Sequence, residues 1–363
     1  MLRNPPLFLQ DLMLAREFPA LRDALRAVPK AEIHLHLDGS IRTQTIIELA
    51  AEQSVSLPTD DPAELDRILQ PGPDCQSLEE YLAAFGITTS VLGTASALER
   101  ISYELCLDLH DDNISYAEIR YSPLFMTSRG LTLDEAVLAV ERGLERGEKE
   151  TGIVTRQLIC AMRNEAGDVS RDVAACAARL VGTTRVVGFD LAGPEAGYPP
   201  SDHQEAYTDA RLGLLRSTVH AGEAAGPASV LSALVHCGAE RLGHGVALRE
   251  DDALRAYVRD RGITVEVCVT SNLQTKAVKD VPDHPVVDFL REGLSVAVCV
   301  DNLAVSATTV TEELALIAEH HDITIAELRA LVAGGFDAAF LPPAEKSALR
   351  DRALAVFDAT FTA

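Results

Sequence analysis

Eight short apolar segments alternate with helix-like segments along most of this chain of 363 residues. Each apolar segment is rich in aliphatic residues and ends at glycine, proline or polar residues, as buried strands do. The eight segments are Ala31–Gly39, Ile114–Pro123, Val154–Arg163, Val186–Pro194, Leu214–Glu223, Glu240–Leu248, Ile263–Asn272 and Leu294–Asn302. Helical spacing recurs between them, at Leu133–Thr151, Asp172–Val181, Pro227–Ala239, Asp251–Arg261 and His284–Glu292. This alternation predicts βαβ units and a parallel sheet.

The number of repeats favours an α/β fold of the (β/α)8 TIM-barrel type over an open doubly wound sheet. An open sheet would usually carry a glycine-rich nucleotide-binding loop after its first strand, and no such loop follows Ala31–Gly39. Hydrophobic residues make up 47% of the chain, enough for a large core. No change of composition separates a second domain, so we expect residues 1–363 to form one.

Three regions lie outside the alternation. Residues 1–30 form an N-terminal extension, in which short amphipathic helices are expected from the spacing of Leu12, Leu14, Phe18, Leu21, Leu25 and Val28. Residues 41–112 form a long insertion after the first segment, mainly helical by pattern, which we expect to cover the barrel mouth as a lid. Residues 311–363 are expected to form C-terminal helices that cap the domain.

The charge and composition of the chain argue against several kinds of partner. Lys and Arg number 32 against 55 Asp and Glu, so the formal net charge is −23, which repels nucleic acids and anionic membrane surfaces. We therefore expect no nucleic-acid partner. No uncharged apolar stretch approaches the ~18 residues of a membrane span, and residues 1–30 do not resemble a signal peptide. The seven cysteines form no Cys-x-x-Cys pair, which favours a reducing cytoplasm.

Histidines and acids gather at the ends of four apolar segments. His34 and His36 are two residues apart in the first segment, so a strand points both side chains to one face. The later segments end with His220 and Glu223, with His244, and with Asp301. In a parallel barrel these ends meet at one mouth, where the active site lies. Histidines that merely belong to the core are the alternative, but cores rarely bury several ionisable groups without a function.

The chemistry of these residues indicates a metal-dependent hydrolase. Three neutral imidazoles and one carboxylate suit Zn²⁺ and leave room for a water molecule. Zn²⁺ lowers the pKa of such a water from about 15.7 to near 7, which gives hydroxide at neutral pH. Glu223 is close to the metal without being needed as a ligand, so it is a candidate proton donor. Taken alone, Glu223 could be a solvated helix cap and His244 a structural histidine; beside a zinc hydroxide, we expect His244 to orient that nucleophile.

Several short motifs occur in a fixed order along the chain. They are Pro29–Ser40, Ala117–Pro123, Asp190–Glu195, His220–Glu223, Arg241–Gly245, Glu266–Cys268, Ser271–Asn272 and Asp301–Asn302. Together they resemble the motifs of adenosine deaminases in the metal-dependent amidohydrolase superfamily. The resemblance extends from about Pro29 to the tail, and the whole set is far more specific than any one motif.

The resemblance implies roles for individual residues. It places zinc on His34, His36, His220 and Asp301. It implies that Glu223 protonates the purine ring nitrogen next to the attacked carbon, while His244 assists the hydroxide and Asp301 also orients it. No lysine that could be carbamylated to bridge two metals, as in binuclear relatives, occurs in Gln157–Arg163 or Val186–Pro194. We therefore expect one Zn²⁺ per chain.

The same resemblance implies the substrate contacts. Asp38 would bind a ribose hydroxyl, and Gly193 would bring its backbone against the purine. Asn302 would face the imidazole-ring nitrogen of the base. We also count His36 among the residues that bind the substrate. Four apolar residues resemble the family's hydrophobic lid: Leu78, Tyr81, Leu82 and Phe85. On spacing alone, the buried face of a helix is an equal interpretation.

Four departures from the family pattern bear on substrate choice. Asn302 stands where many members have Asp; its amide can still donate a hydrogen bond to the base. Val269 and Lys276 occupy positions that are commonly Pro and Gly, and Leu303–Val305 is unusual after Asn302. Asp38 is not a departure: adenine deaminases of this type usually carry Glu at this position, and Asp suits a nucleoside better than a free base.

The resulting hypothesis is zinc-dependent deamination of adenosine and 2′-deoxyadenosine, with a small purine nucleoside as the partner. The alternatives are deamination of another 6-aminopurine, either adenine or a 5′-modified adenosine, and a catalytically silent nucleoside-binding protein. A silent binder has no evident need for the full ligand set together with Glu223. The sequence leaves the oligomeric state open.

Overall fold

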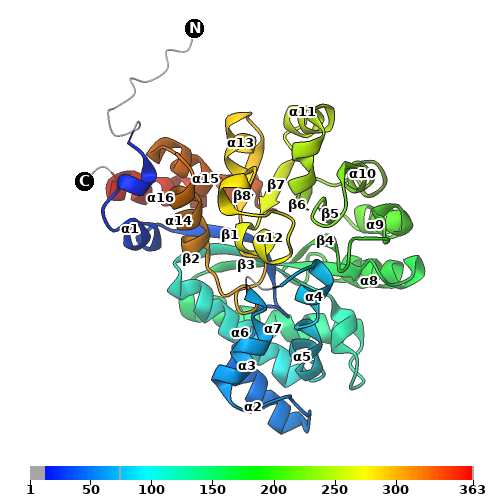
Figure 1. Cartoon of the computed structure of the whole chain (residues 1–363). Helices are drawn as coiled ribbons and strands as arrows, with labels where there is room; N and C mark the ends of the chain where they lie inside the picture. The colour runs from blue at the N-terminus through cyan, green and yellow to red at the C-terminus, as the bar shows by residue number, and fades with distance from the viewer. Residues whose placement is uncertain (1–12, 73–74, 362–363) are drawn as a thin grey trace.

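Eight parallel strands lie side by side in the order in which they occur in the chain (Figure 1). The computed structural model describes residues 13–72 and 75–361. The strands are β1 (Lys30–His36), β2 (Ile114–Tyr121), β3 (Val154–Met162), β4 (Val186–Ala192), β5 (Arg216–Ala221), β6 (Arg241–His244), β7 (Thr264–Val267) and β8 (Ser295–Val298). Just beyond β8, the N–H of Asp301 donates to the carbonyl of His34 at 2.9 Å, and the N–H of His36 donates to the carbonyl of Asp301 at 2.8 Å. These bonds join the last strand to the first, so the predicted (β/α)8 barrel is confirmed.

Helices follow the strands, in the five segments where helical spacing was predicted and in two others. They are α7 (Leu133–Thr151), α8 (Gly167–Leu180), α9 (Gln204–Leu212), α10 (Pro227–Ser232) with its π-helical continuation η7 (Ala233–Cys237), α11 (Asp252–Asp260), α12 (Val269–Gln274) and α13 (Val286–Arg291). The bounds of α7 agree with the prediction because its ends carry strong signals. Thr132 and Glu135 form a capping box at its start, and Gly152 ends it with φ of 78°.

The insertion after β1 is helical, as expected. It contains α2 (Thr43–Gln53), α3 (Pro62–Leu69), α4 (Leu78–Leu82), α5 (Phe85–Thr88), the short helix η4 (Thr89–Val91) and α6 (Ala95–Asp111). In Figure 1 these helices extend from one side of the barrel, in blue and cyan. The long helix α6 packs along α7, which attaches the insertion firmly to the barrel.

The two ends of the described chain pack against each other. On the N-terminal side lie η2 (Ala15–Glu17) and α1 (Leu21–Ala27); on the C-terminal side lie α14 (Val310–His320), α15 (Ile325–Ala338) and α16 (Pro343–Phe361) (Figure 1). Arg22 of α1 pairs with Glu312 of α14, and the rings of Phe18 and Phe361 lie 4.6 Å apart. Leu12 lies outside the described residues. None of the described helices has both the length and the apolarity that a membrane span needs.

The seventh apolar segment differs from the prediction. Its strand β7 ends at Val267, and the following residues of the predicted strand Ile263–Asn272 turn into helix α12. Successive side chains of a strand point to opposite faces, whereas in this helical turn two neighbours contact site residues: Ser271 Oγ donates to Asp301 Oδ2 at 2.7 Å, and Asn272 Nδ2 lies 3.0 Å from His244 Nδ1. Helix α12 therefore belongs to the site.

Candidate active site

A cavity of about 310 Å³ opens at the carboxyl ends of the strands. Almost every residue that the sequence predicts for the site lines it: His36, Asp38, Leu78, Tyr81, Leu82, Phe85, Gly193, His220, Glu223, His244, Asp301 and Asn302. The exception is His34, which is fully buried beneath the cavity. A volume above ~300 Å³ is within the range of small-molecule sites.

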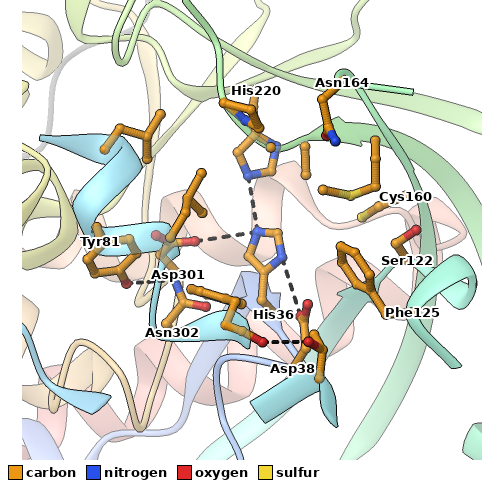
Figure 2. Close-up of a pocket in the computed structure, with 18 of the residues that line it drawn as sticks. His36, Asp38, Tyr81, Ser122, Phe125, Cys160, Asn164, His220, Asp301 and Asn302 are labelled. Carbon is orange, nitrogen blue, oxygen red and sulfur yellow. Dashed lines mark hydrogen bonds and ion pairs between the residues drawn. The ribbon is translucent and has the colours of Figure 1, made fainter. Parts of the chain in front are cut away.

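Three histidines and one aspartate converge on the floor of this cavity. His34, His36, His220 and Asp301 each offer one ligand atom, and these atoms lie within 4.8 Å of one another. Figure 2 shows His36, His220 and Asp301 pointing toward a common point. The Nε2 atoms of His36 and His220 are 3.1 Å apart, and Asp301 Oδ1 lies 3.4 Å from His36 Nε2 and 3.5 Å from His34 Nε2. The strand ends therefore assemble the predicted cluster.

The donor atoms of this cluster fit a divalent metal ion. The Nδ1 of His34 lies 2.7 Å from Glu266 Oε2, and the Nδ1 of His220 lies 3.0 Å from Asp190 Oδ2. Each carboxylate holds the ring proton on Nδ1 and so leaves the lone pair on Nε2. The Nε2 of His34 is buried without a hydrogen-bond partner, a costly state that a bound cation would relieve.

A buried ionic network supports the cluster from inside the barrel. Arg120 donates to Asp190 at 2.8 Å and to Glu266 at 2.9 Å, and all three side chains are fully buried. Burial alone would raise the pKa of Glu266, but the charges of Arg120 and Arg241 hold it well below its usual range. Both carboxylates are therefore ionised, as the acceptors of histidine N–H groups should be.

Glu223 and His244 lie beside the cluster. The Oε2 of Glu223 is 3.7 Å from the Nε2 of His244. Burial, followed by the charge of Asp301, raises the pKa of Glu223 to about 8, so this carboxyl group is protonated at neutral pH and can donate a proton. Burial lowers the pKa of His244 to about 4, so its ring is neutral. The interpretations of Glu223 as a solvated cap and of His244 as backbone-bound do not match these surroundings.

The loop that carries Glu223 is fixed by another buried carboxylate. Glu195 accepts hydrogen bonds from the backbone N–H groups of Gly222, Glu223, Ala224 and Ala225 at 2.6–2.9 Å. These are four consecutive donors that would otherwise lack partners beside the cavity. Glu195 thus determines where the Glu223 side chain begins.

Several cavity residues have backbone conformations that cost energy. His244 and Asp301 have φ of 62° and 69°, in the left-handed region that side chains other than glycine rarely adopt. Such strain is concentrated at functional sites. Gly193 has φ of 101°, and a Cβ there would lie 3.0 Å from Met162 Cε and 3.2 Å from Asn164 Oδ1. Only glycine suits this position, where the backbone faces the cavity.

The lid residues have a double role. Leu78 and Tyr81 of α4 are buried against Cys75, Ala84 and Val305, with Leu82 and Phe85 packed at the edge, and all four lid residues line the cavity. The buried helix face and the lid are therefore the same surface. The hydroxyl of Tyr81 accepts from Asn302 Nδ2 at 2.8 Å (Figure 2). The same hydroxyl lies 2.7 Å from Ser306 Oγ. This polar link between lid and floor was not predicted.

The sequence interpretation missed the residues that hold the cluster in place. Asp190, Glu195 and Glu266 entered only as parts of motifs, without roles of their own. Asp190 and Glu266 lie within the strands β4 and β7, so the available signal was a charged residue inside an otherwise apolar strand. Such a residue is buried only when it is paired.

The fold and the cluster together define a class. A (β/α)8 barrel with three histidines, one aspartate and a buried acid at its mouth is typical of metal-dependent hydrolases. The family model described as "Adenosine deaminase" matches residues 29–356. The chain belongs to the adenosine deaminase family.

Comparison with curated proteins agrees with this assignment. An adenosine deaminase of Mycobacterium ulcerans is 38% identical over 355 residues, covering 93% of this chain and 97% of that protein. A probable adenosine deaminase of Dictyostelium discoideum is also 38% identical, over 90% of this chain, but the chain spans only 42% of that longer protein.

Solved structures with the same fold differ in the purine that their titles name. The adenine deaminase of Arthrobacter aurescens has a TM-score of 0.83 and 27% identity, covering 90% of this chain and 98% of that one. An Arabidopsis ADAL protein complexed with GMP has a TM-score of 0.81 and 26% identity, with 93% and 98% coverage. The fold alone therefore does not determine the purine.

Proposed function

We propose that this chain is a zinc-dependent adenosine deaminase, which converts adenosine and 2′-deoxyadenosine to inosine and 2′-deoxyinosine with release of ammonia. The observation that carries the proposal is the meeting of the His34, His36, His220 and Asp301 cluster with the carboxyl group of Glu223, whose pKa burial raises to about 8, in one cavity. A silent nucleoside-binding protein would require neither. The family match and the identity to curated adenosine deaminases support the same activity.

In this proposal, His34, His36, His220 and Asp301 hold one Zn²⁺, which when bound supplies Lewis-acid activation of a water molecule. The water oxygen adds to the carbon that carries the amino group. Glu223 donates its proton to the adjacent ring nitrogen, so that the carbon becomes electrophilic. His244 and Asp301 orient the attacking oxygen. The bond from carbon to the amino nitrogen then breaks. One proton of the water leaves on ammonia, and the other passes to Glu223 as the carbonyl of the product forms, so that the acid is restored.

The remaining cavity residues bind and orient the nucleoside. The backbone at Gly193 lies against the purine, and the amide of Asn302 faces its imidazole-ring nitrogen. The Oδ1 of Asp38 is buried without a hydrogen-bond partner and lies 3.9 Å from His36 Nδ1, too far for a hydrogen bond. A ribose hydroxyl would supply that partner. This unpaired acceptor favours a nucleoside over free adenine.

The charge of the cavity favours a nucleoside over a nucleotide. The described residues that line it include Asp38, Glu223 and Asp301, but no Lys or Arg. A 5′-phosphate would therefore find no cationic side chain among these residues, on a chain whose net charge is −23. We therefore place AMP, and the mononucleotides that the Arabidopsis neighbours bind, among the poor ligands of this protein.

The proposal extends to the cellular setting and the domain organisation of the enzyme. The seven cysteines are buried and free, in keeping with the reducing cytoplasm in which we place the enzyme. We propose residues 1–363 as one catalytic domain, because within residues 13–72 and 75–361 the insertion and the terminal helices pack onto the barrel or onto the helices that cover it.

The test is a substrate panel with purified, zinc-loaded protein. Loss of the ultraviolet absorbance of adenosine is compared with that of deoxyadenosine, adenine, a 5′-modified adenosine and AMP. We expect adenosine and deoxyadenosine to react fastest. Faster turnover of another member would keep the mechanism and change the substrate, whereas turnover of none would contradict the proposal.

A further inference from the structure

His244 is the inner end of a chain of buried hydrogen bonds. Its Nδ1 lies 3.0 Å from Asn272 Nδ2 on α12, and Asn272 Oδ1 lies 3.2 Å from His284 Nε2. The Nδ1 of His284 lies 3.2 Å from the backbone nitrogen of Val286, the first residue of α13. The three side chains are at most 2% exposed, so water does not compete for these bonds.

The backbone N–H group at the outer end of this series of hydrogen bonds determines which atom carries the proton at each step. The N–H of Val286 can only donate, so His284 Nδ1 accepts and the single proton of its neutral ring is on Nε2. That N–H donates to the oxygen of Asn272, which leaves the amide nitrogen of Asn272 to donate to His244 Nδ1. Because His244 Nδ1 must accept, the proton of its neutral ring is on Nε2. Burial lowers the pKa of His284 to about 3, which agrees with a neutral ring.

We propose that Asn272 and His284 are positioning residues that hold His244 in its Nε2–H tautomer, with that N–H directed into the cavity. The Nε2 of His244 is the ring nitrogen nearer Glu223, at 3.7 Å. His244 then acts as a hydrogen-bond donor to the attacking oxygen and not as a base that removes its proton. This catalytic consequence rests on the proposed deaminase function, whereas the tautomer itself does not.

The tautomer is measured directly by NMR of histidine labelled with ¹⁵N, because the shifts of the ring nitrogens distinguish protonated from unprotonated sites. The His244 signals are assigned by their loss in H244Q. We expect protonated Nε2 and unprotonated Nδ1 in the wild type, with or without added Zn²⁺. A proton on Nδ1 of His244 would overturn the proposal, whether or not the protein deaminates adenosine.

The variant N272D isolates the direction of the hydrogen bond from packing. Its carboxylate has nearly the same shape as the amide but only accepts, so His244 should shift its proton to Nδ1 to donate to it. We expect kcat to fall by about 100-fold or more with little change in KM, since an incorrect catalytic tautomer is known to be severe in other enzymes. N272D with wild-type kcat and an unchanged His244 spectrum would contradict the proposal.

Two substitutions of His284 form a loss-and-rescue pair. H284M removes the N–H that fixes Asn272, whereas H284Q places a carboxamide N–H near the same position. We expect H284M to lose kcat and the pure Nε2–H signal, and H284Q to recover much of both. S170A, which removes a buried hydroxyl 2.8 Å from the imidazole of His203, controls for loss of a buried hydrogen bond elsewhere. Equal loss in H284M, H284Q and S170A would show a merely structural role.

Wild-type turnover separates the two claims. If the wild type shows the Nε2–H tautomer but deaminates no purine, the proposed function fails and the positioning of His244 stands. If the wild type deaminates adenosine but H284M matches it in kcat and tautomer, the proposed function stands and this inference fails.

Discussion

The floor and the lid of the cavity are built in opposite ways. The floor consists of side chains at strand ends, and three of them are held by a second buried group: His34 by Glu266, His220 by Asp190 and Asp301 by Ser271 at 2.7 Å. The lid consists of the short helices α4 and α5, held by a small apolar cluster that includes Val305. One polar link, from Tyr81 to Asn302, joins the two.

This difference separates chemistry from substrate choice. Ionic contacts in a dry interior are directional and costly to disturb, so the floor tolerates little change. Apolar packing accommodates side chains of similar size, so the lid can vary in shape at modest cost. We infer that the barrel determines the reaction and, through Asp38, the preference for a nucleoside, whereas the insertion shapes the lid side of the substrate pocket.

The largest effect is expected from removing a floor ligand. H220A should lose the bound metal and nearly all activity, because three remaining ligands with a solvent-filled gap bind far more weakly. Metal analysis after dialysis is the measurement. H236A, which alters a histidine of η7 that does not line the cavity, should keep both metal and activity. A full equivalent of metal in H220A would disprove the ligand assignment.

The next largest effect is expected from replacing Glu223, the proton donor beside the floor. E223Q should retain its metal but lose at least about two orders of magnitude in kcat, because the amide cannot supply an acidic proton. E250Q, at a nearby exposed glutamate of η8, is the matched control and should behave as the wild type. Near-normal turnover by E223Q would remove Glu223 from the mechanism.

The site residues could be predicted from the sequence where a regular pattern of strands or helices determines their position. His34, His36, His220 and Asp301 were predictable because strand periodicity and barrel topology bring strand ends together regardless of their separation along the chain. Glu223 and His244 followed from their places beside these ligands. The lid residues were predictable as a set, since their spacing gives one helix face.

The contacts between elements could not be predicted in the same way. Asn272 was assigned to the end of a strand, so its bond to His244 had no place in the interpretation. His284 lies outside every motif that the sequence analysis identified, and only the packing of η9 (Val281–Asp283) and α13 brings it to Asn272. Tyr81 was counted as an apolar residue of the lid pattern, so the hydrogen bond of its hydroxyl was not predicted. Periodicity reports which face is buried, but not which polar atoms meet there.

A smaller effect concerns pH. Only the protonated form of Glu223 donates, and its pKa is raised to about 8, so activity should be full at pH 7 and decline as the pH rises through about 8. The pH profile of kcat/KM for adenosine is the measurement, with E223Q, whose residual activity should lack this decline, as the comparison. A decline centred near the ordinary pKa of 4.5 would contradict the assignment.

The smallest effect is expected at the lid. Y81F removes one neutral hydrogen bond to Asn302, worth ~0.5–1.5 kcal/mol, so KM for adenosine should rise by about two- to tenfold with kcat little changed. An adenosine analogue with carbon in place of the imidazole-ring nitrogen should show no such difference. Y103F, which alters a hydroxyl bonded to Glu150 outside the cavity, is the control. A large loss of kcat in Y81F would mean that lid and floor are not separable.

The most direct test of the account is a metal titration. Zn²⁺ is added to chelator-treated protein while the loss of adenosine absorbance is followed. The account predicts a deamination rate that rises in proportion to added Zn²⁺ and levels off at one equivalent per chain. No deamination at one equivalent, or a rate that requires a second ion, would contradict a single metal centre built by His34, His36, His220 and Asp301.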